Sequence, residues 1–378
     1  MALSTSLLRR LRPLAVGALT LTLLVLVGCT TNEATYPQTT LAPKSDFTTL
    51  VDDLFQTTFF WAVIVFVLVE GALLFAIWKF RGQPGDAEPK QVHGNVTLEI
   101  IWTAIPTLIL VLIAVPTVQT IFKTSAMPAN PELEVEVIGH QWWWEYRYPG
   151  LGVVTANELH VPVGKTISLR MWSNDVLHSW WSPQLAAKRD VFPIGPRFQK
   201  INPLWFRADT TGDFSGQCAE FCGLQHAQMG LRVIVQTEAE FDAWVAQQRL
   251  GSPLVNGGIV TAPDTMVAPA GPAIPGLPAA DDPVVVAGQQ VFQAAGCMAC
   301  HAMVGTPLAG QVALIGPNLT HFGSRTTLGA NMYPNTDENL AAWLRDPQGM
   351  KSGSRMILPR ELTEDEIRTL VAYLRAYQ

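Results

Sequence analysis

The chain reads Cys218-Ala219-Glu220-Phe221-Cys222-Gly223-Leu224-Gln225-His226-Ala227-Gln228-Met229 just past its middle. Two thiolates, an imidazole and a thioether this close together suit copper. Zinc also accepts cysteine with histidine, and a disulfide between Cys218 and Cys222 would need no metal at all. The stretch therefore predicts a metal site, for which copper is the best match to the ligand types.

Further along, the chain reads Cys297-Met298-Ala299-Cys300-His301, the attachment motif of a c-type haem. Cys297 and Cys300 would form thioethers with the haem, and His301 would ligate the iron from one face. Taken alone, the motif also fits zinc binding or thiol exchange. Two redox centres on one chain predict that electrons are relayed through it.

The composition restricts the class of protein. The chain has 378 residues, of which 48% are hydrophobic and 15% charged, so part of it is expected in lipid. The net charge is −6 and no Lys/Arg-rich run occurs, which argues against a nucleic-acid role. All five cysteines can be assigned to chemistry other than disulfides: Cys29, Cys218, Cys222, Cys297 and Cys300.

Residues 1–28 have the layout of a secretory signal, with three arginines before an apolar run from Leu14 to Val27. The run ends Leu26-Val27-Gly28-Cys29, which resembles a lipobox. That resemblance implies cleavage before Cys29 and a diacylglycerol on its sulfur. An ordinary exported protein or a signal anchor is the alternative.

A polar segment over 29–50 leads into a predicted transmembrane hairpin over 51–123. Its apolar runs, about 54–80 and 98–122, are each long enough to cross a bilayer. Lys79, Arg81 and Lys90 put the intervening loop in the cytoplasm by the positive-inside rule. Everything after about residue 123 then lies outside, as expected for a bacterial cell-membrane protein.

The pattern changes to short alternating runs over 130–246, which suggests an all-β sandwich or barrel. A Gly-, Pro- and Ala-rich linker is predicted over 247–283. Over 284–378 the signals are helical, with helices expected at 286–294, 337–344 and 363–376. The last begins Thr363-Glu364-Asp365-Glu366, a capping box.

Together with His178, the pattern Cys-x-Glu-x-Cys-x3-His-x2-Met resembles the binuclear copper centre of cytochrome c oxidase subunit II. The resemblance covers roughly 45–245. It includes the motifs Glu99-Ile100-Ile101-Trp102-Thr103-Ala104-Ile105-Pro106 and Gly139-His140-Gln141-Trp142-Trp143-Trp144. It implies a two-helix transmembrane hairpin and a cupredoxin-like sandwich.

The resemblance also implies roles for single residues. Cys218 and Cys222 would bridge two copper ions, and the remaining ligands would be His178, His226, Met229 and the backbone carbonyl of Glu220. The carboxylate of Glu220 would help to hold a magnesium ion against the catalytic subunit, unless it is simply solvated.

Two further residues match functional positions of the family. Trp142 would lie on the electron-entry surface, although packing at the membrane interface is an alternative. Glu99 would stand at the cytoplasmic mouth of a proton-uptake pathway, although an interfacial carboxylate can be merely solvated.

The region after the linker resembles a small, all-α class I cytochrome c, in which Gly316-Pro317-Asn318-Leu319 would lie against His301. The second iron ligand is expected in the loop before the last helix, where Met356 fits best. Met350 is a competitor because Pro359 follows Met356 at three residues rather than directly. Met303 is too close to His301, and Met332 lies farther upstream.

These resemblances predict subunit II of a haem-copper cytochrome c oxidase with a fused cytochrome c. An external donor, a cytochrome c or a copper protein, would supply electrons. They would pass through the haem and copper to catalytic subunit I, which reduces oxygen to water with proton pumping. The rivals are a copper-free quinol oxidase subunit, a nitric or nitrous oxide reductase, and a metal- or haem-delivery protein.

Overall fold

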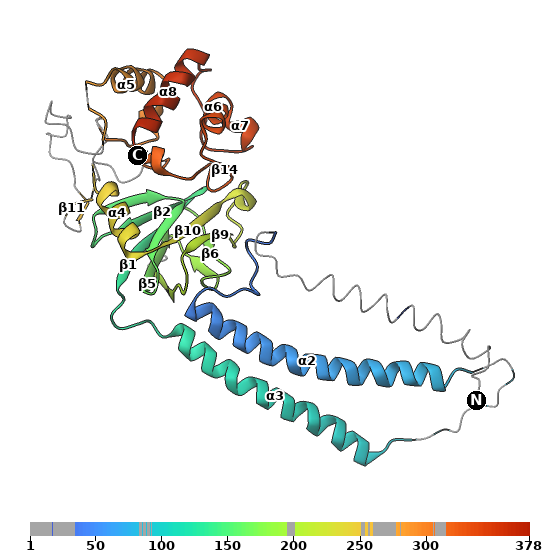
Figure 1. The fold of residues 1–378 in the computed structure, drawn as a ribbon. Coiled ribbons are helices and arrows are strands. Elements are labelled where there is room, and N and C mark those ends of the chain that lie inside the picture. The colour runs from blue at the N-terminus through green and yellow to red at the C-terminus, as the bar shows by residue number, and fades with distance from the viewer. Residues whose placement is uncertain are drawn as a thin grey trace, which may run out of the picture.

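A computed structural model gives the structure of the chain. It describes residues 17, 35–82, 85, 88, 91, 93–194, 201–250, 254–255, 258–259, 277–279, 281–304, 306 and 315–378. Figure 1 shows three parts in sequence order: a helical hairpin, a β-sandwich, and a helical domain on the side of the sandwich away from the hairpin. The predicted lipidation site Cys29 lies outside the described residues.

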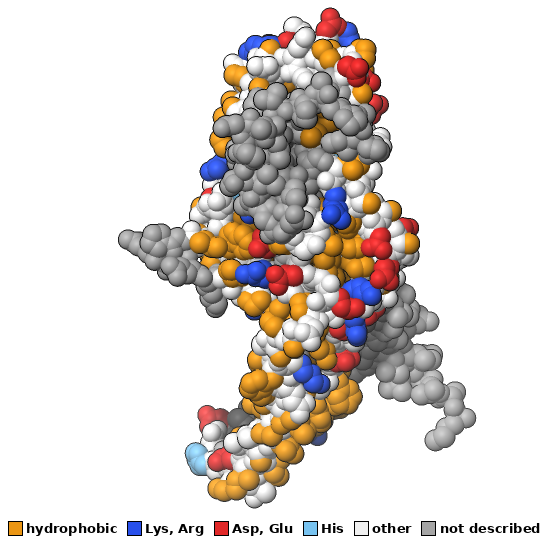
Figure 2. Space-filling model, turned by 90° about the vertical axis from the view of Figure 1, so that its left-hand side faces the viewer, with side chains coloured by type: hydrophobic (Ala, Val, Ile, Leu, Met, Phe, Trp, Pro, Cys, Tyr) orange, Lys and Arg blue, Asp and Glu red, His pale blue; other side chains and the backbone are white. Residues whose placement is uncertain are grey.

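The hairpin consists of α2 (Asp46–Lys79) and α3 (Val96–Ser125). Both helices are long and apolar enough to cross a membrane, and the apolar windows that qualify them are not buried within the chain. Hydrophobic side chains cover most of the visible face of this arm in Figure 2. α3 runs through Pro106 and Pro116 without ending, which membrane helices tolerate. The predicted two-helix hairpin is confirmed.

The start of α2 is packed into the sandwich. The sequence had assigned residues 29–50 to a polar segment and did not predict this packing. Ser45 caps α2 in a reciprocal capping box with Thr48. The Ser45 hydroxyl also donates to the Leu185 carbonyl at 2.6 Å, and the Thr48 hydroxyl donates to the Gln184 carbonyl at 2.9 Å. Phe47 is 2% exposed and belongs to the sandwich core. The sandwich and α2 therefore share a packed joint.

The sandwich contains two five-stranded sheets, which confirms the sandwich over the barrel. The first has the order β3-β2-β1-β5-β8, and the second β4-β10-β9-β6-β7. Their bounds are β1 Leu133–His140, β2 Trp143–Tyr148, β3 Val153–Ala156, β4 Glu158–Pro162, β5 Thr166–Ser173, β6 His178–Trp181, β7 Arg189–Val191, β8 Asn202–Arg207, β9 Gly212–Cys218 and β10 Gly230–Gln236. Helix α4 (Glu238–Gln248) follows β10.

The alternation of apolar and polar residues that predicted the strands also explains why the two sheets pack face to face. Leu133, Val135 and Val137 point one way from β1 into a core shared with β5, β9 and β10, and each is at most 9% exposed. Burial of apolar area of this kind is the main favourable term in folding. The two packed sheets therefore form a frame, and the loops that join the strands, including the loop between β9 and β10, lie at its ends.

The last domain contains α5 (Pro283–Ala294), α6 (Asp337–Arg345), α7 (Pro347–Met350) and α8 (Glu364–Ala376). Each expected helix is present, and Thr363 and Glu366 make the predicted capping box. Two short pairs add to them: β13 (Thr327–Leu328) with β14 (Tyr333–Pro334), and β11 (Leu254–Val255) with β12 (Gly258–Ile259). The second pair lies within the expected linker.

Candidate metal centre and haem cavity

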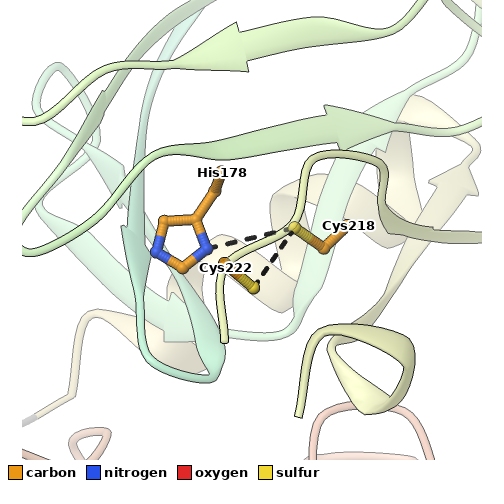
Figure 3. Close-up of side chains that lie close together, drawn as sticks. All are labelled: His178, Cys218 and Cys222. Carbon is orange, nitrogen blue, oxygen red and sulfur yellow. Dashed lines mark hydrogen bonds between the residues drawn. The ribbon is translucent and has the colours of Figure 1, made fainter. Parts of the chain in front are cut away.

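The candidate copper ligands meet at one end of the second sheet. Cys218 ends β9, Met229 directly precedes β10, and His178 begins β6, which pairs with β9. Between Cys218 and Met229 the loop carries Cys222 and a single turn of 3₁₀ helix that begins at His226. Adjacent strand ends thus bring residues from two distant segments together (Figure 3).

The distances among these side chains fit shared metal ions. Cys218 Sγ lies 3.7 Å from Cys222 Sγ and 3.9 Å from His178 Nδ1. Cys222 Sγ lies 3.8 Å from His226 Nδ1 and 3.9 Å from Met229 Sδ. Two metal bonds of zinc-like length, sulfur at about 2.3 Å and nitrogen at about 2.0 Å, add up to more than any of these separations. The ligand atoms are therefore close enough to share ions.

The sulfur atoms are too far apart for a disulfide, whose S–S bond is about 2.05 Å. Both cysteines are free and 3% exposed. The contact between the two sulfur atoms lowers the pKa of Cys218 to about 3 and raises the pKa of Cys222. A metal that binds both sulfur atoms would release protons, because the thiolate is the ligating form of cysteine.

Asp175 orients His178, a role that the sequence did not predict. His178 Nε2 and Asp175 Oδ1 are 2.9 Å apart, which leaves Nδ1 facing Cys218. Asp175 also accepts hydrogen bonds from the backbone N–H groups of Val176 and Gln141. Burial opposes the charge on the ring, but the contacts with Asp175 and Cys218 outweigh it and raise the pKa of His178. Such carboxylate–histidine pairs fix the ligating nitrogen in metal sites.

The carbonyl group of Cys222 connects this loop to β1 and β2. Trp142 Nε1 donates to it at 2.9 Å and Gln141 Nε2 at 2.8 Å. The Glu220 carbonyl is 3.3 Å from Cys218 Sγ, and its side chain is partly exposed. Trp142 therefore touches the metal loop directly, and Glu220 presents its backbone oxygen to the cluster.

Glu99 is remote from this cluster. It lies in the first turn of α3, at the end of the hairpin away from the sandwich (Figure 1). Its side chain is exposed, and Oε1 accepts a hydrogen bond of 3.3 Å from the backbone N–H of Asn95. The structure thus does not bring Glu99 together with the other candidate residues.

A cavity lies between the sandwich and the last domain. Cys297, Cys300, His301 and Met356 all line it, opposite residues of the sandwich that include Trp142. Of the four methionines considered, Met356 alone is among the lining residues. Met303 is buried elsewhere, and Met332 is 38% exposed. Trp343 Nε1 also donates to Met356 Sδ at 3.0 Å.

His301 is held in a fixed orientation at this cavity. Its Nδ1 donates to the Pro317 carbonyl at 2.8 Å, so Nε2 is the nitrogen left for a metal. A Cβ on Gly316 would come within 2.4 Å of His301 Cε1, which only glycine avoids. Burial lowers the pKa of His301 and favours the neutral, ligating form. The turn that follows the motif therefore packs against the histidine, as the resemblance implied.

Two cationic side chains at the cavity, the half-buried Arg325 and the buried Lys351, were missed from the sequence and fit a ligand with carboxylates. Arg325 has a buried Nε with no hydrogen-bond partner, and burial lowers its pKa to about 10. Lys351 is 3% exposed, donates to the Gly329 carbonyl at 2.9 Å, and has a pKa lowered by burial to about 8. Haem carries two propionates, so two thiols, an oriented histidine, a thioether and two cations form a consistent haem site.

Three family models match consecutive parts of the chain. The transmembrane domain of cytochrome c oxidase subunit II matches residues 38–120, the periplasmic domain of the same subunit matches 151–237, and cytochrome c matches 285–378. The hairpin, the sandwich and the last domain are therefore a membrane anchor, a periplasmic copper-binding domain of cupredoxin type, and a cytochrome c domain.

Relatives match along most of the chain. Cytochrome c oxidase subunit 2 of Alkalihalophilus pseudofirmus is 35% identical over 359 residues, 93% of this chain and 94% of the relative. That of Bacillus sp. PS3 is 34% identical over 314 residues, 78% of this chain and 79% of the relative. A solved periplasmic domain of subunit II from Bradyrhizobium japonicum is 32% identical and covers 32% of this chain and 97% of that chain, with a TM-score of 0.30.

The relatives identify the complex in which the chain works. Oxidase subunits of this kind act with other oxidase subunits and with electron donors. The chain carries both a copper domain and a haem domain, and its oxidase relatives exclude the reductase and delivery rivals. The chain belongs to the cytochrome c oxidase subunit II family and is the electron-transfer subunit of the oxidase, with a cytochrome c domain fused after the copper domain.

Proposed function

We propose that the chain passes electrons from an external donor through haem c to a binuclear copper centre and on to catalytic subunit I. The observation that carries the proposal is the Gln141–Trp142 pair. Both residues line the haem cavity, and both donate to the carbonyl of the copper-loop residue Cys222. When bound, haem and copper supply the one-electron redox couples.

In this proposal the copper ions are held by His178, Cys218, Cys222, His226, Met229 and the Glu220 carbonyl. The separations of 3.7–3.9 Å between neighbouring side-chain ligands support sharing of two ions. Asp175 keeps Nδ1 of His178 directed at the site. The β-strand frame fixes the loop, so little rearrangement is needed when the charge of the centre changes.

Cys297 and Cys300 would hold the haem covalently, and His301 and Met356 would supply a nitrogen and a sulfur ligand to its iron. The position of all four on one cavity supports this assignment. Arg325 and Lys351 receive the propionates. The N–H of Trp343 holds the Met356 sulfur in place, which favours Met356 over Met350.

The catalytic subunit docks on the copper loop. Phe221 is 75% exposed beside Glu220, and Leu224 on the same loop is 78% exposed, so this loop presents two apolar side chains to a partner. A magnesium ion bound in part by the Glu220 carboxylate would lie at that contact. Removal of divalent ions from a Glu220→Ala oxidase should then leave its activity unchanged, whereas the unsubstituted complex loses activity.

Glu99 takes part in proton uptake. Glu99 lies at the hairpin end opposite the periplasmic domains, which supports a cytoplasmic position. Glu99→Ala should slow steady-state oxygen consumption more than it slows haem-to-copper electron transfer.

Cys29 carries a lipid in this proposal. Intact mass spectrometry of the mature chain tests the lipid: an unmodified Cys29 would refute it, without loss of the membrane anchor.

The central test is purification of the complex from native membranes. Metal analysis should give three coppers per complex, two from this chain and one from the haem–copper site of subunit I, and visible spectra should give covalent haem c. Rapid reduction of the haem in the anaerobic complex should be followed by reduction of copper. Oxygen uptake without reduction of copper would contradict the proposed order.

A further inference from the structure

One segment of the cytochrome domain, residues 325–331, lies between the haem cavity and the copper domain. We call it the docking segment. Toward the cavity it contributes the lining residues Arg325, Thr327, Leu328, Gly329 and Ala330. Away from the cavity it is hydrogen bonded to strands β4 and β10 of the sandwich. Its position therefore links the haem site mechanically to the copper domain.

A buried carboxylate of the sandwich holds one end of the docking segment. Glu158, the first residue of β4, is 2% exposed. Its Oε1 accepts from the backbone N–H groups of Thr326 and Thr327 at 2.9 and 2.8 Å. It also accepts from their hydroxyl groups at 2.7 and 3.0 Å. Hydrogen bonds to an ionised acceptor are stronger than those between neutral groups.

The copper domain itself does little to satisfy this carboxylate. His160 Nε2 is 4.0 Å from Glu158 Oε2, beyond hydrogen-bond distance. Burial lowers the pKa of His160 to about 4, so the ring is neutral at pH 7. Within the described part of the chain, every hydrogen bond to the Glu158 carboxylate comes from the cytochrome domain. The buried Glu158 carboxylate therefore has its hydrogen-bond donors only when the cytochrome domain is docked on the sandwich.

The other end of the docking segment is joined to the residues that follow Met229. The Gly230 N–H donates to the Ala330 carbonyl at 3.1 Å, and Asn331 Nδ2 donates to the Leu231 carbonyl at 3.0 Å. A Cβ on Gly230 would approach the Ala330 oxygen to 2.8 Å, so the fit needs glycine there. One segment is thus fixed both at Glu158 and beside a copper ligand.

We propose that Glu158 is a positioning residue, which holds the docking segment so that the haem cavity faces Trp142 and the copper loop. The inference rests on the proposed haem-to-copper transfer and adds the element that sets its geometry. A tether alone keeps two domains at high effective concentration but does not orient them. The charge-assisted contacts of Glu158 supply that orientation.

The test compares Glu158→Ala and Glu158→Gln in the intact oxidase, with Glu134→Gln as the matched control. Glu134 lies on β1, is exposed, and pairs with Arg170 on the same sheet. Hydrogen–deuterium exchange at Thr326 and Thr327 should quicken by about tenfold or more in Glu158→Ala. Glu158→Gln, whose amide oxygen still accepts, should show a smaller change, and the control none.

A photoexcited ruthenium complex can reduce the haem and start transfer to copper. In Glu158→Ala this transfer should slow by about tenfold or more and become dependent on solvent viscosity, because the domain must first redock. Haem and copper spectra should be unchanged. The Thr326→Ala/Thr327→Ala double variant should slow transfer similarly and add little further slowing to Glu158→Ala.

Unchanged exchange and unchanged transfer in Glu158→Ala would overturn the inference. So would slower transfer that stays independent of viscosity and is additive with the threonine substitutions. If Glu158→Ala does not assemble, the threonine variant carries the same test on the same contact. Absence of haem-to-copper transfer in the unsubstituted chain would instead refute the proposed function, while exchange at Thr326 and Thr327 would still decide the contact.

Discussion

The copper loop and the haem cavity reach their ligand geometry in different ways. At the copper loop the neighbouring ligand atoms lie within 3.7–3.9 Å of each other, because strands β6, β9 and β10 hold them there. At the haem cavity the candidate ligands His301 and Met356 belong to the lining of an open space between the cytochrome domain and the sandwich. The candidate copper ligands are thus already close together, whereas the candidate haem ligands line a space that a cofactor would fill.

This difference indicates how far the folding of each domain depends on its cofactor. The sandwich has a large apolar core, including Val135, Leu169 and Val233, in which Cys218, Cys222 and Met229 make up only a small part. The core of the cytochrome domain is smaller and surrounds the cavity, so the cofactor completes it. Small domains depend most on such additions, since their own cores supply little stability.

The largest expected effect follows from removing the haem attachment. Cys297→Ser/Cys300→Ser should abolish covalent haem and leave the cytochrome domain sensitive to proteolysis, while the copper domain keeps its metal. Haem staining after denaturing electrophoresis, limited proteolysis and copper EPR measure the three properties. A protease-resistant cytochrome domain without haem would show that its core is complete without the cofactor.

The next effect tests the preformed frame. Cys222→Ser should abolish the mixed-valence copper signal, yet change the free energy of unfolding of the sandwich by no more than about 2 kcal/mol. EPR and thermal unfolding provide the measurements, and the unsubstituted chain is the reference. An unfolded sandwich in Cys222→Ser would mean that copper is part of its core after all.

A smaller effect is expected at the second axial ligand. Met356→Ala should remove the weak long-wavelength band of iron–thioether ligation and lower the haem potential by on the order of 100 mV. Redox titration of the oxidised and reduced spectra measures both. Met350→Ala serves as the control, and the assignment fails if this substitution, rather than Met356→Ala, lowers the potential.

The smallest effect concerns the orientation of His178. Asp175→Asn should weaken copper binding by about tenfold to a hundredfold without unfolding the domain, since the amide cannot reproduce both accepting oxygens. Competition with a copper chelator measures the affinity. The neighbouring substitution Asn174→Ala is the control, because no side-chain contact of Asn174 reaches the described copper ligands. Equal affinities would assign Asp175 a role in the loop alone.

Local patterns in the sequence predicted most of the architecture. The apolar runs, the alternation over β1 and the Thr363 capping box each involve residues a few positions apart, where periodicity is informative. The contacts that join the parts have no such pattern. Glu158 and Thr326 are separated by 168 positions, and Gln141 and Cys222 by 81.

The candidate site divides in the same way. Spacing identified Cys218, Cys222, His226 and Met229 because they share one loop. Asp175, Arg325 and Lys351 were not identified, because a buried carboxylate or cation acquires its role only from the space around it in the folded chain. The N-terminal joint at Ser45 was missed because its partners Gln184 and Leu185 come from a loop far along the chain.

That joint has a consequence for the height of the copper loop above the membrane. Because Phe47 packs in the sandwich core and Arg207 N–H bonds to Asp46 Oδ1 at 2.9 Å, tilting of α2 must carry the copper domain with it. None of residues 126–132, which connect α3 to β1, is buried, although Glu132 exchanges hydrogen bonds with Thr166 at the start of β5. The first helix is therefore expected to set the height and tilt of the copper domain above the membrane, while the second helix is joined to that domain only by an exposed connection.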